Sequence, residues 1–357
     1  MFLTGRIRLL GRSSRGGVSF RAVTTHCLRG SVMDFLRVSF PVSGVTTFAF
    51  LPALVSFAVS LFTSMGGVSG AFLLLPFQVS VLHFTSPSVS ATNFVYNIVA
   101  IPSGVYRYIR EGRMAWPLTW IVIAGTLPGV VIGYYLRILY LPDPRAFKFF
   151  VGLVLLYIGA RLLYEVTGRS RRGREQLEAL EKRFNEYAGR LKEQRAARLA
   201  AGLPPEAVVK AVSWSLSRVE YEFWGQRFSF STAGMFLLAF IVGVIGGTYG
   251  IGGGAIIAPF CVTVFRLPVY TVAGAALLGT FITSIAGVFF YSVIPARAGL
   301  STAPDWLLGS LFGVGGFVGM YCGARLQKFL PQTVLKGILG LIILFLALSY
   351  ILQYLRT

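Results

Sequence analysis

Long apolar stretches separated by short polar ones run through the chain from about residue 45 to its C-terminal part. A helix needs about 20 apolar residues to cross the hydrocarbon core of a bilayer. The pattern therefore predicts an all-α, polytopic membrane protein. The segments that we expect in the first part of the chain are 45–66, 70–83, 88–109, 117–139 and 147–164. Those expected in the second part are 231–250, 254–266, 271–291, 305–324 and 333–353.

The two series of segments resemble each other in sequence. The stretch GVSGAFLLLPF at 67–77 matches GIGGGAIIAPF at 250–260, at an offset of 183 residues. The same offset pairs Gly104 with Gly287 without a gap. We therefore predict two homologous halves with eight to ten membrane segments, because self-similarity at a fixed spacing indicates repeated structural units.

The short segments 70–83 and 254–266 decide how the two halves are related. If both only re-enter the membrane, each half crosses four times and the repeats are parallel. If both cross, each half crosses five times and the repeats are inverted. The first arrangement is slightly favoured, because the basic arm, residues 107–113 and the linker then share one side of the membrane.

Four parts follow along the chain: a basic N-terminal arm (1–40), a first membrane repeat (41–165), a charged extramembrane linker (166–230) and a second membrane repeat (231–357). Apolar residues of the linker recur at spacings of three and four, which is typical of an amphipathic helix. Either this helix is a solvated connector on the membrane surface, or it contacts a second copy or a larger complex. The sequence leaves both interpretations open.

Composition agrees with a membrane protein and locates the charge. Of the 357 residues 55% are hydrophobic and 13% charged, whereas a soluble domain carries about 25% charged residues. The net charge of +20 lies in the arm, in the linker and at the ends of apolar segments. Because no pattern of interleaved basic and aromatic residues accompanies this charge, we expect no binding of nucleic acid.

The arm contains seven arginines and one acid, Asp34. An arginine- and serine-rich, acid-poor N-terminus is typical of a mitochondrial transit peptide. A basic tail on the cytoplasmic face of another membrane is the alternative. We therefore expect a protein of the mitochondrial inner membrane, with the plasma membrane as the second possibility.

Glycine runs before the two matched prolines raise the question of a nucleotide site. No lysine follows either run, as a phosphate-binding loop requires, and the preceding segment FLLAFIVGVIGG is a membrane span rather than a strand. Consecutive glycines instead predict a helix broken inside the membrane, which survives only where it is buried in protein or lines a wet cavity. Paired breaks in two halves point to the central site of a transporter.

The backbone N–H groups that open a helix after such a break form an anion site without any charged side chain. We expect three kinds of site residue. Backbone donors at the breaks are Gly67, Ser69, Gly70, Gly250, Gly252, Gly253 and Gly254. Polar side chains that bind substrate or join helices are Asn93, Asn97, Thr280, Thr283 and Ser284. The structural helix-breaking residues are Pro76 and Pro259.

Other chemistry is disfavoured by what the sequence contains. The three cysteines and two histidines are scattered and match no metal-ligand spacing, so we expect no metal and no cofactor. None of the thirteen acids lies in the middle of a predicted span, which argues against transport of a cation. No nucleophile and base occur together, so an enzyme is not expected. The glycine pairs Gly129/Gly133 and Gly315/Gly319 are interpreted as close helix packing.

The motif GIGGGAIIAPF, with its weaker copy GVSGAFLLLPF, resembles the sulfite exporter TauE/SafE family of membrane transporters. The resemblance covers about residues 45–164 and 231–353. It implies a secondary transporter of small organic or sulfur-containing anions, of the sulfite, sulfonate or carboxylate class, working by alternating access. The alternative is a non-transporting structural subunit of a larger mitochondrial membrane complex.

Overall fold

The computed structural model describes residues 37–65, 69–110, 112–166, 208–223, 225–294, 301–326 and 332–356. Each of the predicted apolar segments corresponds to one helix. Those in the first part of the chain are α2 (Phe50–Met65), α3 (Ala71–Ser80), α4 (Ser88–Arg110), α5 (Trp116–Leu139) and α6 (Pro144–Val166). Those in the second part are α8 (Thr232–Tyr249), α9 (Gly254–Thr263), α10 (Val269–Val293), α11 (Trp306–Leu326) and α12 (Gln332–Leu355). The protein is an all-α, polytopic membrane protein.

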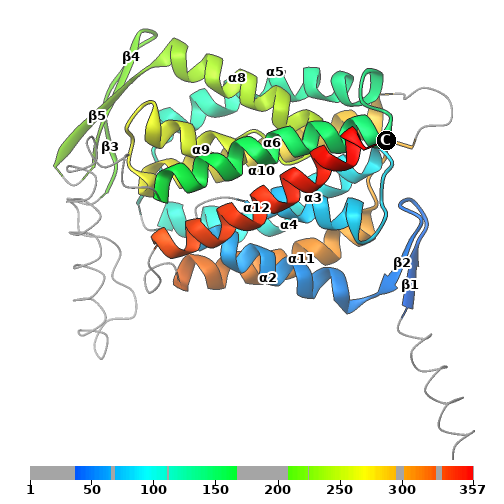
Figure 1. Cartoon of the computed structure of the whole chain (residues 1–357). Helices are drawn as coiled ribbons and strands as arrows, with labels where there is room; N and C mark the ends of the chain where they lie inside the picture. The colour runs from blue at the N-terminus through cyan, green and yellow to red at the C-terminus, as the bar shows by residue number, and fades with distance from the viewer. Residues whose placement is uncertain are drawn as a thin grey trace, which may run out of the picture.

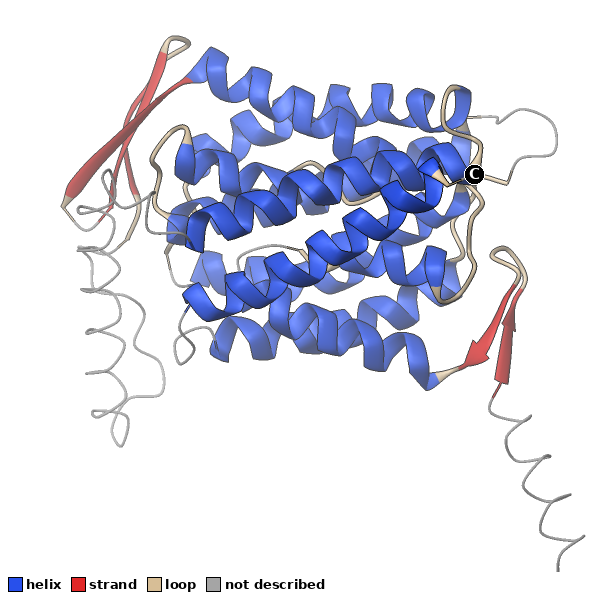
Figure 2. Cartoon of the chain, viewed as in Figure 1, coloured by secondary structure: helices blue, strands red, loops and turns tan. Residues whose placement is uncertain are grey.

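Short antiparallel strands lie at opposite ends of the helical body (Figures 1 and 2). At one end β1 (Arg37–Phe40) and β2 (Val45–Phe48) form a hairpin. At the other end β3 (Lys210–Trp214), β4 (Arg218–Phe223) and β5 (Gln226–Ser231) form a sheet in that order. We call these the hairpin end and the sheet end.

The strands correct the predicted division of the chain. The arm was bounded at residue 40, yet 37–40 already form β1. No strand was predicted in the linker, yet its last part forms the sheet β3–β5. In β4 every second side chain is buried, the alternation of a half-buried strand that the helical interpretation overlooked. The predicted amphipathic helix of the linker and the rest of the arm lie outside the described residues.

Contacts at the two ends of the body show the directions of α4 and α10. The hairpin turn 41–44 lines one hollow together with 85–87 before α4 and with Ser301 before α11. At the other end α10 begins where Thr271 meets Tyr221 of β4, with 2.9 Å between the two hydroxyl oxygens. Thus α4 starts at the hairpin end, whereas α10 starts at the sheet end.

The two series of helices therefore run in opposite directions. α2 starts beside β2 and α8 starts beside β5, at opposite ends of the body (Figure 1). Both α2 and α4 start at the hairpin end. The chain must therefore return to the hairpin end after α2, and the break and α3 together make this return. The slight preference for a parallel arrangement is wrong, because the two series run in opposite directions. Gly112 accepts a hydrogen bond from Val209 N at the sheet end, so this loop and the described end of the linker share one side as expected. Arg37 of β1 lies at the hairpin end, and the arm before it lies outside the described residues.

Glycines let the long helices approach closely, as expected for Gly129/Gly133 and Gly315/Gly319. α5 packs along α8 and α11 along α2. A Cβ at Gly129 would lie 2.5 Å from the Phe240 carbonyl oxygen, and one at Gly315 would lie 1.9 Å from that of Ala53. These contacts confirm the interpretation of the glycines as packing positions.

α4 differs from the other long helices in its polarity. Among the residues that the structure describes, six helices are long and apolar enough to span a membrane, namely α5, α6, α8, α10, α11 and α12. α4 has 23 residues but carries polar side chains along much of its length, most of them buried. It packs against α3, α10 and α11, so protein rather than lipid surrounds these side chains. α4 is therefore the element on which a polar site can be built inside the membrane.

Candidate functional site

Two interruptions of the helical chain lie at the centre of the body. The first separates α2 from α3; Ser69 and Gly70 of it are described, and Gly67 lies outside the described residues. The second separates α8 from α9 and comprises 250–253. Gly250 (φ 89°) and Gly252 (φ 76°) have left-handed backbone conformations there, which glycine adopts without steric cost. The helical chain is therefore interrupted at both predicted places, and at the second one glycines in left-handed conformations produce the break.

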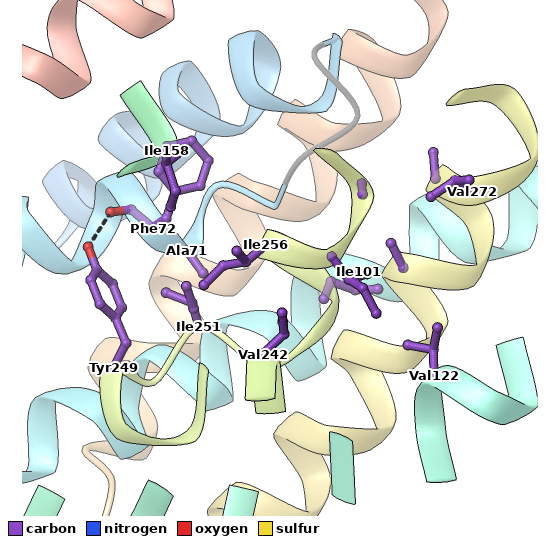
Figure 3. Packing of buried hydrophobic residues seen from close by; sticks show 14 of the residues in the cluster. Ala71, Phe72, Ile101, Val122, Ile158, Val242, Tyr249, Ile251, Ile256 and Val272 are labelled. Atoms are coloured by element: carbon purple, nitrogen blue, oxygen red, sulfur yellow. Dashed lines mark hydrogen bonds between the residues drawn. The ribbon is translucent and has the colours of Figure 1, made fainter. Parts of the chain in front are cut away.

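The prolines act differently from the prediction that they break the helices. Pro76 lies inside α3 and Pro259 inside α9, and neither ends its helix. Proline has no N–H to donate to the carbonyl four residues earlier, which leaves the Phe72 oxygen without that intrahelical bond. The Tyr249 hydroxyl donates to this oxygen at 2.8 Å (Figure 3). Pro76 thus creates an acceptor in α3 that ties it to the end of α8.

Two asparagines of α4 bind the unwound backbone of both breaks. Asn93 Nδ2 donates at 3.0 Å both to Ala71 O, in the first turn of α3, and to Gly250 O. One turn later Asn97 Nδ2 donates to Ile251 O at 3.1 Å. The N-terminus of α3 and the second break are therefore adjacent, and a single amide joins them.

The carbonyl oxygens of these asparagines accept further hydrogen bonds. Ser69 Oγ donates to Asn97 Oδ1 at 2.9 Å, and Gln78 Nε2 donates to Asn93 Oδ1 at 3.3 Å. Because both amide groups donate to backbone carbonyls, the asparagines hold the breaks together in this conformation. Of the two interpretations left open by the sequence, the structure shows the joining of helices.

Hydroxyls of α10 surround the second break. A Cβ at Gly252 would lie 2.8 Å from Thr280 Cγ2 and 3.3 Å from Ser284 Oγ. Gly253 N donates to Thr283 Oγ1 at 3.4 Å, a long hydrogen bond. At Gly254 a Cβ would lie 1.7 Å from the Ala276 carbonyl oxygen, so only glycine fits there. The structure thus brings the predicted second-half residues together.

Some polar groups around the breaks are buried without a hydrogen-bond partner among the described residues. They include Ser284 Oγ beside the second break, Thr63 Oγ1 beside the first and Gln78 Oε1 between them. Such groups are uncommon in folded proteins and call for an explanation such as a bound ligand. The described backbone-donor and polar site residues are all buried and carry no charge, so the site is closed in this conformation.

Several residues of this region were missed in the sequence. Gln78 interrupts the apolar stretch AFLLLPFQVS, and Tyr96 contributes a hydroxyl that lies 2.7 Å from Ser60 Oγ and faces Gly70. Arg137, in GYYLRIL, is a fully buried cation inside a predicted span. The rule that ionisable residues inside membranes are functional candidates identifies Arg137 from sequence, but it was applied only to the acids.

Two series of helices, each interrupted near the centre of the body, form an arrangement that is known from membrane transporters. The family model that matches this chain is "Sulfite exporter TauE/SafE", over residues 52–350. The chain belongs to this family.

Curated relatives carry the same general description. The chain is 32% identical to the probable membrane transporter protein YdhB of Bacillus subtilis over 101 residues, 28% of this chain and 38% of that protein. It is 28% identical to a probable membrane transporter protein of Methanocaldococcus jannaschii over 116 residues, 31% of this chain and 41% of that protein. With the probable membrane transporter protein YunE of Bacillus subtilis it shares 19% over 295 residues, 81% of this chain and 92% of that protein. The match thus spans about two fifths of the first two relatives, and no solved structure matches the chain.

Proposed function

We propose that the chain is a secondary transporter of small organic or sulfur-containing anions, of the sulfite, sulfonate or carboxylate class. The observation that carries the proposal is the meeting of the α3 N-terminus with the second break, which precedes α9, at Asn93. Neither helix has a side-chain cap at its N-terminus: the capping positions are Gly70 and Gly253. Two N–H groups at these termini make only long hydrogen bonds to hydroxyls, from Ala71 N to Ser69 Oγ and from Gly253 N to Thr283 Oγ1, both at 3.4 Å. A bound anion would replace these long hydrogen bonds.

Electrostatics supports a negatively charged substrate. Each helix N-terminus is equivalent to about half a positive charge, so two neighbouring ones supply about one unit. The described residues around the breaks include no carboxylate that would cancel this charge. Hydroxyls such as Ser284 Oγ supply neutral donors beside it, and an oxyanion accepts hydrogen bonds from both kinds of group.

We further propose that the two series of helices are inverted repeats and that transport occurs by alternating access. Local structure recurs at the offset of 183 residues. The two described non-glycine residues with left-handed φ are His83 and Arg266, each three residues after a short helix. The hydrogen bond Phe84 N to Gln78 O recurs as Leu267 N to Cys261 O. Inverted repeats give two conformations of similar packing, open to opposite sides.

A second role has a specific observation in its favour. Ala71, Ile251, Ile256 and Val242 pack around the breaks and fill the space between them (Figure 3). A closed centre fits one state of a transport cycle, but it also fits a transporter fold kept as a structural subunit of a mitochondrial complex. The mitochondrial inner membrane, with the plasma membrane as the alternative, and the role of the linker in assembly remain proposals.

Substitution of Ser284 tests the proposed site without disturbing the fold. Its hydroxyl has no hydrogen-bond partner, so Ser284→Ala removes no bond of the closed protein. If this hydroxyl binds the anion, the KM for saturable uptake of labelled sulfite or a small sulfonate into proteoliposomes rises about 5- to 10-fold, the effect of one hydrogen bond. The Tm in detergent stays unchanged or rises.

Ser56→Ala is the matched control. Ser56 Oγ donates to Phe312 O at 2.6 Å between α2 and α11, so its loss lowers the Tm and leaves the KM unchanged. Absence of uptake of any sulfite, sulfonate or carboxylate by correctly folded wild-type protein would reject transport and favour the structural subunit.

A further inference from the structure

Arg137 is a buried cation close to the hairpin end of α5. Its side chain has no exposed surface. Its Nη1 donates to the Leu141 carbonyl oxygen just beyond the helix, and the guanidinium lies 3.7 Å above the ring of Phe147. These contacts hold the guanidinium in one orientation, and the hydrogen bond to Leu141 occupies only its Nη1 group.

The other side of the guanidinium has no partner. Nε and Nη2 of Arg137 are buried without a hydrogen bond among the described residues. The two described acids at this end are already engaged: Asp143 accepts from Ala146 N, and Asp305 accepts from Ser43 and Leu308. No described carboxylate forms an ion pair with Arg137.

A cation in this position is costly and needs a reason. Arg137 lies in the last turn of α5, yet its side chain is buried, and an ion buried without a counter-charge is costly unless its hydrogen bonds are satisfied. Nε and Nη2 form one edge of the planar group, whose two parallel N–H bonds match two oxygens on a single atom. The missing partner is therefore an oxyanion and not a halide.

We propose that Arg137 is an anion-binding residue at the hairpin end, and that it recognises substrates that carry two oxygens on one carbon or sulfur atom. This inference rests on the proposed function and adds a specificity-determining site to it. The site differs from the helix breaks, where the described residues carry no charge.

A cluster of aromatic residues (Phe94, Tyr134 and Tyr291) connects Arg137 to the second break. Tyr134 lies three residues before Arg137 in α5, and the Tyr291 hydroxyl donates to Gly247 O at 3.2 Å, three residues before Gly250. The Tyr291 ring contacts Tyr134 at 4.9 Å and Phe94 at 5.9 Å between centroids. An anion held at Arg137 is thus separated from the break by these rings, which must move for it to pass.

Thermal unfolding of the full chain in detergent measures binding at this residue independently of transport. Sodium sulfite and sodium methanesulfonate are titrated against sodium chloride of equal ionic strength. The two oxyanions should raise the wild-type Tm more than chloride does. In Arg137→Lys and Arg137→Gln the concentration for a half-maximal shift should increase about tenfold or more, since a two-bond contact to a charge is lost. Arg145→Gln, which removes an exposed cation at the same end of the molecule, should change it by less than about threefold.

Two results would overturn the inference: an unchanged half-maximal concentration in a folded Arg137 variant, or chloride as effective as the oxyanions on the wild type. If Arg137→Gln does not fold, Arg137→Lys, which keeps the positive charge, is the variant on which binding is measured. Uptake of labelled sulfite by wild-type proteoliposomes separates the two claims. Binding that depends on Arg137 without uptake supports the site and contradicts the transport function. Uptake that does not depend on Arg137 supports the transport function and contradicts the proposed site.

Discussion

The hydrogen bond between Tyr249 and α3 can be tested by removing one hydroxyl. Tyr249→Phe leaves the ring in place and deletes the donor to the Phe72 carbonyl oxygen, 2.8 Å away. This oxygen is buried, and Pro76 supplies no N–H to replace the lost bond. The variant therefore leaves an unsatisfied carbonyl at the centre of the membrane region.

The expected loss of stability is about 1–3 kcal/mol, the cost of leaving a buried polar group unpaired. A second substitution isolates the cause. Pro76→Ala gives α3 an N–H within reach of the Phe72 oxygen, so the double variant Pro76→Ala, Tyr249→Phe has a replacement donor. Tyr249→Phe should then cost close to nothing in the Pro76→Ala background, so the coupling between the two sites should approach the full cost of the single substitution, about 1–3 kcal/mol.

Thermal unfolding in detergent, monitored by intrinsic fluorescence, measures the four proteins of this cycle. Tyr249→Phe should lower the Tm by a few degrees, and the double variant should match Pro76→Ala closely. Strictly additive changes in Tm would refute the claim that the proline creates the acceptor for Tyr249.

Two further predictions concern packing and the hairpin. Gly129→Ala places a methyl group 2.5 Å from the Phe240 carbonyl oxygen and should destabilise the protein by about 1–3 kcal/mol. Gly337 has open space around it, so Gly337→Ala should leave the Tm equal or higher. Equal Tm values for the two variants would disprove the packing role of Gly129. Asp305→Asn weakens the two hydrogen bonds from Ser43 and should speed hydrogen exchange in the β1–β2 hairpin; unchanged exchange would show that the carboxylate does not hold it.

Hydrophobic pattern predicted the helices because each long one must be apolar over a bilayer's thickness. The glycine runs predicted the breaks, since Gly250 and Gly252 adopt conformations that other residues avoid. The strands were missed for a physical reason as well. Strands β3–β5 lie in a charged segment, and the alternation in β4 is weak beside the apolar spans around it. The uncharged strand β2 was included in the predicted membrane segment 45–66.

The orientation of the helices and the hydrogen-bond partners of the asparagines could not be predicted from the sequence. The direction of α10 depends on how 254–266 returns the chain, which depends on contacts between distant segments rather than on local composition. Asn93 and Asn97 were correctly placed near the breaks, yet whether an amide faces a ligand or a carbonyl is decided by packing. Here the unwound carbonyls of Gly250 and Ile251 need donors, and the asparagines supply them.

The central claim is that a small oxyanion gains alternating access to the two sides of the membrane through the paired breaks. Counterflow in proteoliposomes tests this claim most directly. Vesicles that contain the wild-type protein are loaded with unlabelled sulfite and diluted into a trace of labelled sulfite. A carrier that exchanges substrate across the membrane concentrates the label transiently above its equilibrium level, and we predict this overshoot. Label that enters no faster than into protein-free vesicles, or that equilibrates without an overshoot, would contradict the account.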